Sequence, residues 1–125
     1  MLEIIIEKDK NKTAEYYKQS GVEYNNDCEM LKAEDKGEII GFCLFRQEKD
    51  IFYLLYAQPS DDLMLLDGLV RSMLHIASQR LIGEAYYVSS APGEQLKKLG
   101  FIEDFNNKKL KMLPLLGNCE NCKNI

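Results

Sequence analysis

The side chains with the strongest chemistry in this 125-residue chain are four cysteines and one histidine. Cys119 and Cys122 form a C-x-x-C pair near the C-terminus, a spacing that metal sites and redox pairs share. A structural zinc ion needs four ligands, and only Cys28, Cys43 and His75 could complete the set. A thioredoxin-type pair would open a helix after a strand, whereas this pair lies in a tail. Two exposed thiols in a frayed tail are therefore the first interpretation, and a metal site shared between two chains is the alternative.

Other groups able to move protons are few. The carboxylates Glu34, Glu48 and Glu103 could each act as a base in some substrate pose, although a solvated surface is the usual place of such residues. No serine is flanked as a nucleophile elbow requires, and the single histidine, His75, excludes catalysis by a histidine cluster. The residues alone assign no catalytic group.

The composition is that of one ordinary globular domain, with 46% hydrophobic and 29% charged residues. Sixteen basic and twenty acidic residues leave a net charge of −4, which argues against a nucleic-acid-binding surface. The cluster Lys108, Lys109 and Lys111 fits a solvated strand edge. No apolar run approaches the roughly 18 residues of a membrane span, and no basic region precedes the short apolar start, as a signal peptide requires. We expect a cytoplasmic protein with reduced thiols and no membrane or nucleic-acid partner.

The hydrophobic pattern predicts seven strands and three helices in the order β-α-β-β-β-α-β-α-β-β. The strands are expected at residues 2–7, 28–34, 38–46, 51–57, 85–89, 101–105 and 110–115, and the helices at residues 12–19, 63–80 and 93–99. The run 51–57 is apolar on both faces, which is typical of a strand in the middle of a sheet. Gly41 lies inside an apolar strand, which indicates a bulge or the close approach of another segment.

Residues 63–80 form the clearest helix of the sequence. Its apolar side chains recur at helical spacing and predict one continuous buried stripe: Leu66, Leu69, Val70, Met73, Ile76 and Ala77. Ser60, Asp61 and Asp62 supply an N-cap with acidic side chains in front of this helix, and Gly83 is expected to end it.

Two motifs carry a resemblance to a known family. The segment Gly37-Glu38-Ile39-Ile40-Gly41-Phe42 is a polar turn followed by a strand that contains glycine. The segment Leu96-Lys97-Lys98-Leu99-Gly100-Phe101 ends a helix in K-x-G-F. Together with the order of elements, these motifs resemble the GNAT superfamily of N-acetyltransferases. The resemblance implies an α/β (strictly α+β) fold with a mixed, mainly antiparallel sheet and a central helix after the fourth strand. It covers residues 1–118 as a single domain and leaves residues 119–125 as a C-terminal tail.

The coenzyme A motif of that family is degenerate in this sequence. Active members carry R/Q-x-x-G-x-G/A between the fourth strand and the central helix, where backbone N–H groups hold the pyrophosphate. The corresponding stretch is Ser60-Asp61-Asp62-Leu63-Met64-Leu65-Leu66, and the next glycine is Gly68. Asp61 and Asp62 would cap the helix themselves and meet the pyrophosphate with like charge. Acetyl-CoA is therefore expected to bind weakly, at best in the high micromolar range.

The resemblance also implies where the rest of the cofactor would lie. The pantetheine arm of acetyl-CoA would pair with the backbone of Tyr56, Ala57 and Gln58, at the end of the fourth strand. Leu63 and Met64, at the start of the central helix, would add apolar contacts.

The family's general acid is a tyrosine at the end of N-x-x-A-x-x-L-Y, ahead of the G-F pair. Counting back from Gly100 places Leu96 at that tyrosine, and a leucine has no proton to donate. Tyr86 or Tyr87 could substitute from the neighbouring strand, although tyrosines in such a strand more often belong to the core or the sheet face.

Three functions stay open on this basis. The resemblance implies an acetyl-CoA-dependent N-acetyltransferase that acts on a small-molecule or protein amine. The alternative is a GNAT-like binding or dimerisation module, for instance a homodimer, that has lost the cofactor site. A third option is an acyltransferase that holds another acyl donor in the same cleft.

Overall fold

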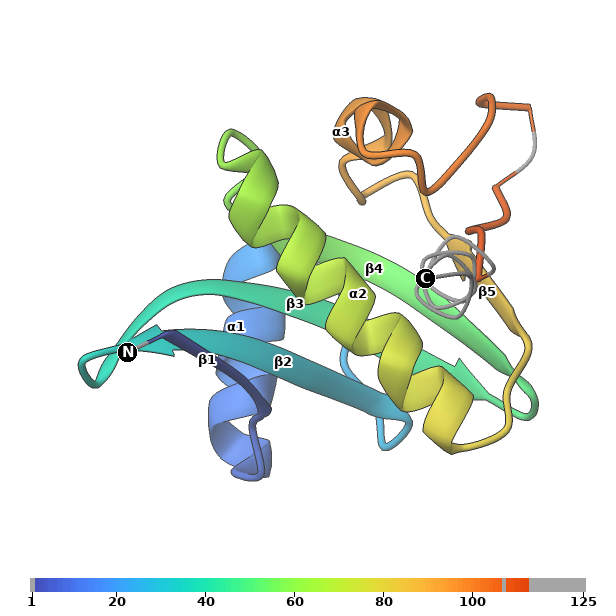
Figure 1. Ribbon diagram of the computed structural model, residues 1–125. Coiled ribbons are helices and arrows are strands. Elements are labelled where there is room, and N and C mark those ends of the chain that lie inside the picture. Colours follow the sequence, from blue (N-terminus) through green and yellow to red (C-terminus); the bar gives the residue numbers. More distant parts are fainter. Residues whose placement is uncertain (1, 107, 113–125) are drawn as a thin grey trace.

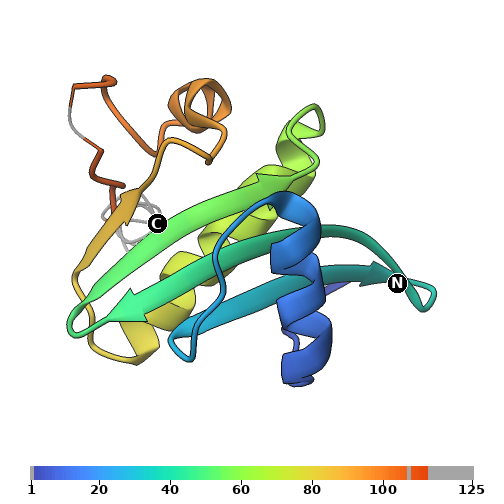
Figure 2. The same cartoon turned by 180° about the vertical axis from the view of Figure 1, so that it is seen from behind.

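A five-stranded sheet with a helix on each face forms the body of the molecule (Figures 1 and 2). The computed structural model describes residues 2–106 and 108–112. The elements are β1 (Leu2–Ile6), α1 (Lys10–Ser20), β2 (Cys28–Asp35), β3 (Glu38–Glu48), β4 (Ile51–Gln58), α2 (Leu63–Gln79), β5 (Glu84–Tyr87) and α3 (Gly93–Lys98). The strands lie in the order β1-β2-β3-β4-β5, with antiparallel pairs throughout except for the parallel pair β4–β5. The predicted α+β fold is confirmed.

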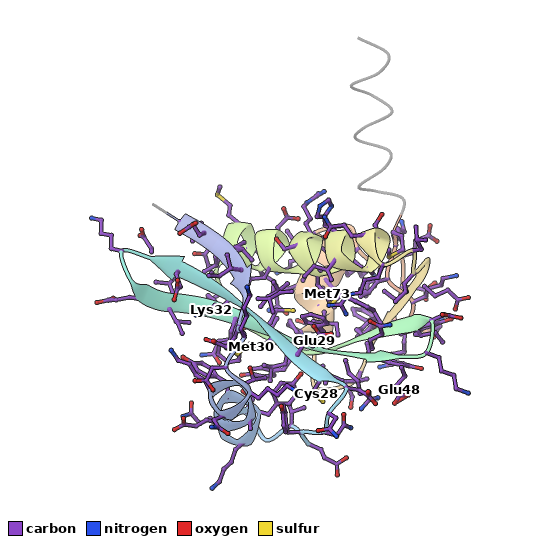
Figure 3. The ribbon with its side chains drawn as sticks, turned by 90° about the horizontal axis from the view of Figure 1, so that it is seen from below. Cys28, Glu29, Met30, Lys32, Glu48 and Met73 are labelled. Atoms are coloured by element: carbon purple, nitrogen blue, oxygen red, sulfur yellow. The ribbon has the colours of Figure 1, made fainter. Side chains whose placement is uncertain are left out.

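Side chains of β4 alternate between two apolar layers. Phe52, Leu54 and Ala57 pack toward α2 in the main core, and Leu55 packs in a smaller core under α1. Figure 3 shows both layers edge-on, with Met73 on the α2 side of the sheet. The doubly apolar pattern of residues 51–57 therefore identified a strand that is covered on both faces.

Helix α2 lies across the sheet and buries the stripe expected from its sequence, except that Ile76 is only half-buried. Its buried residues are Leu65, Leu66, Leu69, Val70, Met73, Leu74 and Ala77. The helix ends at Gln79, one residue before the expected end, and its C-cap is Arg80, so Gly83 does not end it as expected. Leu81 adopts a left-handed backbone conformation (φ 61°), and the N–H of the buried Ile82 donates to the Ala77 carbonyl at 2.8 Å. This hydrogen bond and the burial of Ile82 hold Leu81 in a conformation that glycine would adopt more easily.

The predicted hairpin near the C-terminus is only partly visible, and its first strand is wrong. Residues 101–105 form bends, while Phe101 and Ile102 are buried in the main core. The Asp104 carboxylate accepts the Asn106 N–H at 2.9 Å, a local turn that competes with strand pairing. One antiparallel bridge joins Tyr86 to residue 109. Residues 113–115 of the second expected strand, the cysteines of the C-x-x-C pair and the tail 119–125 lie outside the described residues.

Candidate functional site at the β4–β5 divergence

The two parallel strands β4 and β5 separate after a short paired stretch (Figure 1). A cleft lies beyond this point, between the end of β4 and the segment that follows β5. Their register ends at Leu54 opposite Tyr87, and the Val88 N–H donates to the Leu54 carbonyl at 3.1 Å. Beyond this point β4 continues to Gln58, while the Ser90 hydroxyl donates to the Leu55 carbonyl. In the described register, the last residues of β4 therefore have no strand partner on the β5 side.

The cleft has a volume of about 630 Å³ and takes its lining from three segments. They are the end of β4, the β4–α2 loop and the segment that leads into α3: Tyr56, Ala57, Gln58, Pro59, Ser60, Asp61, Ser90, Pro92 and Gln95. Three of the five predicted cofactor-binding residues, Tyr56, Ala57 and Gln58, belong to this lining. Leu63 and Met64 lie outside it on the first turn of α2, with 37% and 87% of their surface exposed. Contact of any of the five with a cofactor stays a prediction.

Gly41 of β3 positions the end of β4 against the start of α2. A Cβ atom at this position would lie 2.9 Å from the Gln58 carbonyl oxygen and 3.0 Å from Leu65 Cδ2. The β2–β3 register shifts beside it, between Ala33 and Glu34. Both consequences expected of a glycine inside this strand, the bulge and the close approach, are confirmed.

The turn before α2 uses its own carboxylate as a cap. The Asp62 Oδ1 atom accepts the Leu65 N–H at 3.1 Å, and the Asp62 carbonyl accepts the Leu66 N–H at 2.9 Å. Asp61 is the only charged residue in the described lining of the cleft. The pyrophosphate of coenzyme A needs free N–H groups or cations. This lining does not fit it, although the unpaired β4 edge suits the amide groups of a pantetheine arm.

Of the phenols near the site, only Tyr56 lines the cleft in the described structure, and its hydroxyl donates to Gln58 Oε1 at 3.0 Å. Tyr86 lies outside the cleft and donates to Glu84 at 3.2 Å; the charge of Glu84 raises the pKa of Tyr86, which makes it a weaker acid. Tyr87 is a core residue, 4% exposed. The sequence analysis treated Tyr56 only as a backbone contact, although its place near the end of β4, beside the proposed cofactor contacts, could have indicated a role for its hydroxyl.

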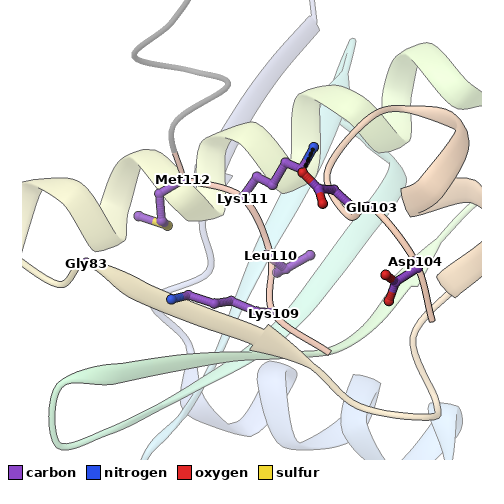
Figure 4. Close-up of a pocket in the computed structure, with 7 residues that line it drawn as sticks. All are labelled: Gly83, Glu103, Asp104, Lys109, Leu110, Lys111 and Met112. Carbon is purple, nitrogen blue, oxygen red and sulfur yellow. Dashed lines mark ion pairs between the residues drawn. The ribbon is translucent and has the colours of Figure 1, made fainter. Parts of the chain in front are cut away.

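The other candidate groups lie elsewhere in the described structure. Glu34 pairs with Lys32 at 3.3 Å and Glu48 with Arg46 at 3.1 Å. Glu103 pairs with residue 111 at 3.2 Å beside a separate cavity of about 520 Å³, shown in Figure 4.

The remaining cysteines and the histidine also lie apart from the cleft. Cys28 and Cys43 are buried, and burial raises the pKa of the Cys43 thiol, so it is poorly ionised. His75 is exposed on α2. Within residues 2–106 and 108–112, no three His, Cys, Asp or Glu side chains lie close enough together to hold a metal ion, and no helix is long and apolar enough to cross a membrane.

A mixed sheet with a central helix after the fourth strand, and a cleft where β4 and β5 part, define the class: the chain has a GNAT-like fold. One similar solved structure is the ribosomal-protein-S18-alanine N-acetyltransferase of Escherichia coli, with a TM-score of 0.60 and 14% identity over 87% of this chain and 88% of that one. A GNAT-family acetyltransferase of Staphylococcus aureus gives 0.50, with 10% identity over 71% and 74% of the two chains. The PaiA N-acetyltransferase of Thermoplasma acidophilum, in complex with coenzyme A, gives 0.51, with 20% identity over 76% and 62%. No family model and no curated protein matches the sequence.

Proposed function

We propose that this chain is an N-acyltransferase that moves an acyl group from a thioester to an amine in the β4–β5 cleft. The observation that carries the proposal is the stretch of β4 beyond Leu54, which has no strand partner on the β5 side and lies beside a cavity of about 630 Å³. The acetyltransferase names of the similar structures support the reaction class. Acetyl-CoA is the donor that the fold resemblance implies, and the amine would be a small molecule or a protein.

The reaction forms a C–N bond between the amine and the acyl carbon and breaks the C–S bond of the thioester. The amine loses a proton and the sulfur leaves as a thiol, so the atoms balance without any further reactant. In this chain the unpaired β4 edge would orient the donor through backbone hydrogen bonds. Tyr56 would hold a proton at its hydroxyl within the cleft, since its present partner is a neutral amide oxygen of Gln58.

A matched pair of tyrosine variants tests this proposal. Tyr56 and Tyr86 each donate a hydrogen bond to a side chain two residues away, but only Tyr56 lines the described cleft. Purified protein would be incubated with acetyl-CoA or S-acetylpantetheine and a panel of polyamines, lysine peptides and peptides with free N-termini, with products detected by mass spectrometry. We expect acetylated product, at least a tenfold lower rate for Tyr56→Phe, and an unchanged rate for Tyr86→Phe. Absence of product with every donor and acceptor would argue against the enzyme.

A binding module without catalysis is the second candidate, and Leu96 is the observation that favours it. This residue stands at the family's general-acid position and is fully buried in the core, so nothing at that position can protonate a leaving thiolate. Binding of a thioester or an amine in the cleft without any product would support this second function.

A further inference from the structure

We propose that the acyl donor of this cleft carries no nucleotide: the site is built for an uncharged arm of pantetheine type and discriminates against the phosphates of coenzyme A. The inference rests on the proposed function and names the donor class of the same site. It is carried by three observations: the capped Leu65 N–H at the start of α2, the charge of the cleft and the position of the lysines of α3.

One N–H group in the first turn of α2 is already engaged, because the Asp62 carboxylate accepts the Leu65 N–H at 3.1 Å. The Leu66 N–H donates to the Asp62 carbonyl in the first regular hydrogen bond of the helix. The first-turn side chains that flank this cap, Leu63 and Met64, are apolar and exposed. A phosphate at this turn would have to displace a carboxylate that is covalently in place, and it would meet hydrocarbon instead of a bare glycine backbone.

The electrostatics of the cleft oppose an anion as well. The described lining contains no lysine, arginine or histidine, and its one formal charge is the carboxylate of Asp61. The neighbouring Asp62 adds a second negative charge at the same turn. Two like charges repel a ligand with several phosphates most strongly at low ionic strength, where the Debye length is long.

The lysines of the neighbouring helix α3 line another surface. Lys97 and Lys98 line a separate cavity of about 430 Å³ together with Glu94 and Phe105. The Lys97 ammonium lies 5.1 Å from the centre of the Phe105 ring. Neither lysine belongs to the lining of the β4–β5 cleft, so neither is placed there to pair with a phosphate.

A pantetheine arm matches what the cleft does offer. Such an arm consists of amides, hydroxyls and a thioester without formal charge. The lining presents neutral donors and acceptors of the same kind: Tyr56, Gln58, Ser60, Ser90 and Gln95. Amide and hydroxyl groups pair with one another without the desolvation penalty of a phosphate ion.

A ligand series of increasing negative charge tests the inference. Pantetheine, 4′-phosphopantetheine and coenzyme A would be titrated calorimetrically into the full chain at about 20 and 200 mM salt. We expect affinity to fall in that order, with pantetheine at least fivefold tighter than coenzyme A at low salt, and the difference to shrink at high salt. Asp61→Asn should reduce the ratio of the affinities for pantetheine and coenzyme A several-fold. The control Glu94→Gln removes a carboxylate outside the cleft and should leave this affinity ratio unchanged.

The outcomes separate this inference from the proposed function. Coenzyme A binding tighter than pantetheine, with an affinity that salt weakens, would overturn the inference and leave the acyltransferase in place. Equal affinities of all three ligands at both salt concentrations would also overturn it. If none of the three bound and no thioester was consumed, the proposed function would fail, and this inference with it.

Discussion

The two ends of α2 are held in different ways. At the C-terminal end, the Arg80 guanidinium donates two hydrogen bonds to the Glu29 carboxylate, at 2.8 and 2.9 Å, and a third to Gln47 at 2.7 Å. This end is therefore tied to β2 and β3. At the N-terminal end, the Asp62 side chain provides one hydrogen bond, and it stays within the helix's own first turn. The contrast predicts that substitutions of the exposed first-turn residues Leu63 and Met64 cost the fold little.

The largest predicted effect on the free energy of unfolding lies in the middle of α2, and the effects at its two ends are compared with it. Leu69 is fully buried between α2 and the sheet, so Leu69→Ala should lower the free energy of unfolding by about 2–5 kcal/mol. Met64 is 87% exposed at the cleft end, and Met64→Ala should change stability by less than about 0.5 kcal/mol. Urea denaturation measures both values. A loss below about 1 kcal/mol for Leu69→Ala would contradict the packing of α2 on the sheet.

The clamp at the C-terminal end gives the next largest effect. Arg80→Ala removes a bidentate ion pair that is about one-third exposed and should cost about 1.5 kcal/mol. Arg71 is the matched control, because it also forms an ion pair, with Asp67 at 2.8 Å, and also lies over an aromatic ring. That pair stays within one helix, so Arg71→Ala should cost only about 0.3–0.5 kcal/mol. An equal loss in both variants, by the same denaturation measurement, would show that the tie between α2 and the sheet adds nothing.

Removal of the Asp62 cap at the cleft end should have a smaller effect on stability still. Two variants separate the contribution of its hydrogen bond from that of its charge. Asp62→Ala should destabilise the protein by about 1 kcal/mol, because the Leu65 N–H loses its acceptor. Asp62→Asn keeps an acceptor oxygen and should cost less than about 0.5 kcal/mol. Both changes should increase the affinity for coenzyme A measured calorimetrically. Weaker coenzyme A binding in the asparagine variant would show that the carboxylate assists the ligand instead of repelling it.

Much of the body of this fold could be predicted because its elements have clear hydrophobic patterns. The short continuous apolar run of β4 and the stripe of α2, with its period of 3.6 residues, are strong signals, and both elements were found within one or two residues of their ends. Residues 101–105 have the apolar content of a strand, but Phe101 and Ile102 reach the core from an irregular backbone. The composition of these residues cannot distinguish a strand from an irregular segment, because both would bury the same apolar side chains.

The site was harder to predict than the fold, because it forms where two strands part. The family resemblance pointed to Tyr56, Ala57 and Gln58 at the end of the fourth strand, and all three line the cleft. Ser90 and Gln95 come from segments beyond β5, and only the three-dimensional path of the chain brings them to β4. The same path excludes Tyr86 from the cleft, although it lies next to β4 in the sheet.

The smallest predicted effect lies at the sheet edge away from both ends of α2, and it concerns the ion pair of Glu7 with Lys32. Glu7 accepts a hydrogen bond from Lys32 at 2.9 Å, and this contact, together with the Asp9 N–H, lowers the pKa of Glu7 below its ordinary value of 4.5. A carboxyl group whose pKa is lower in the folded state stabilises the fold above the unfolded value, and this stabilisation is lost as the pH falls through the folded value. Glu7→Gln should therefore lower Tm at pH 7 by an amount equivalent to less than about 1 kcal/mol, and the difference from the unmodified protein should shrink as the pH falls below 4.5 and through the folded pKa of Glu7. The control Glu15→Gln, on the exposed face of α1, should leave Tm nearly unchanged at pH 7. A Tm difference for Glu7→Gln that stays the same at acid pH would show that the ionised carboxylate of Glu7 does not stabilise the fold.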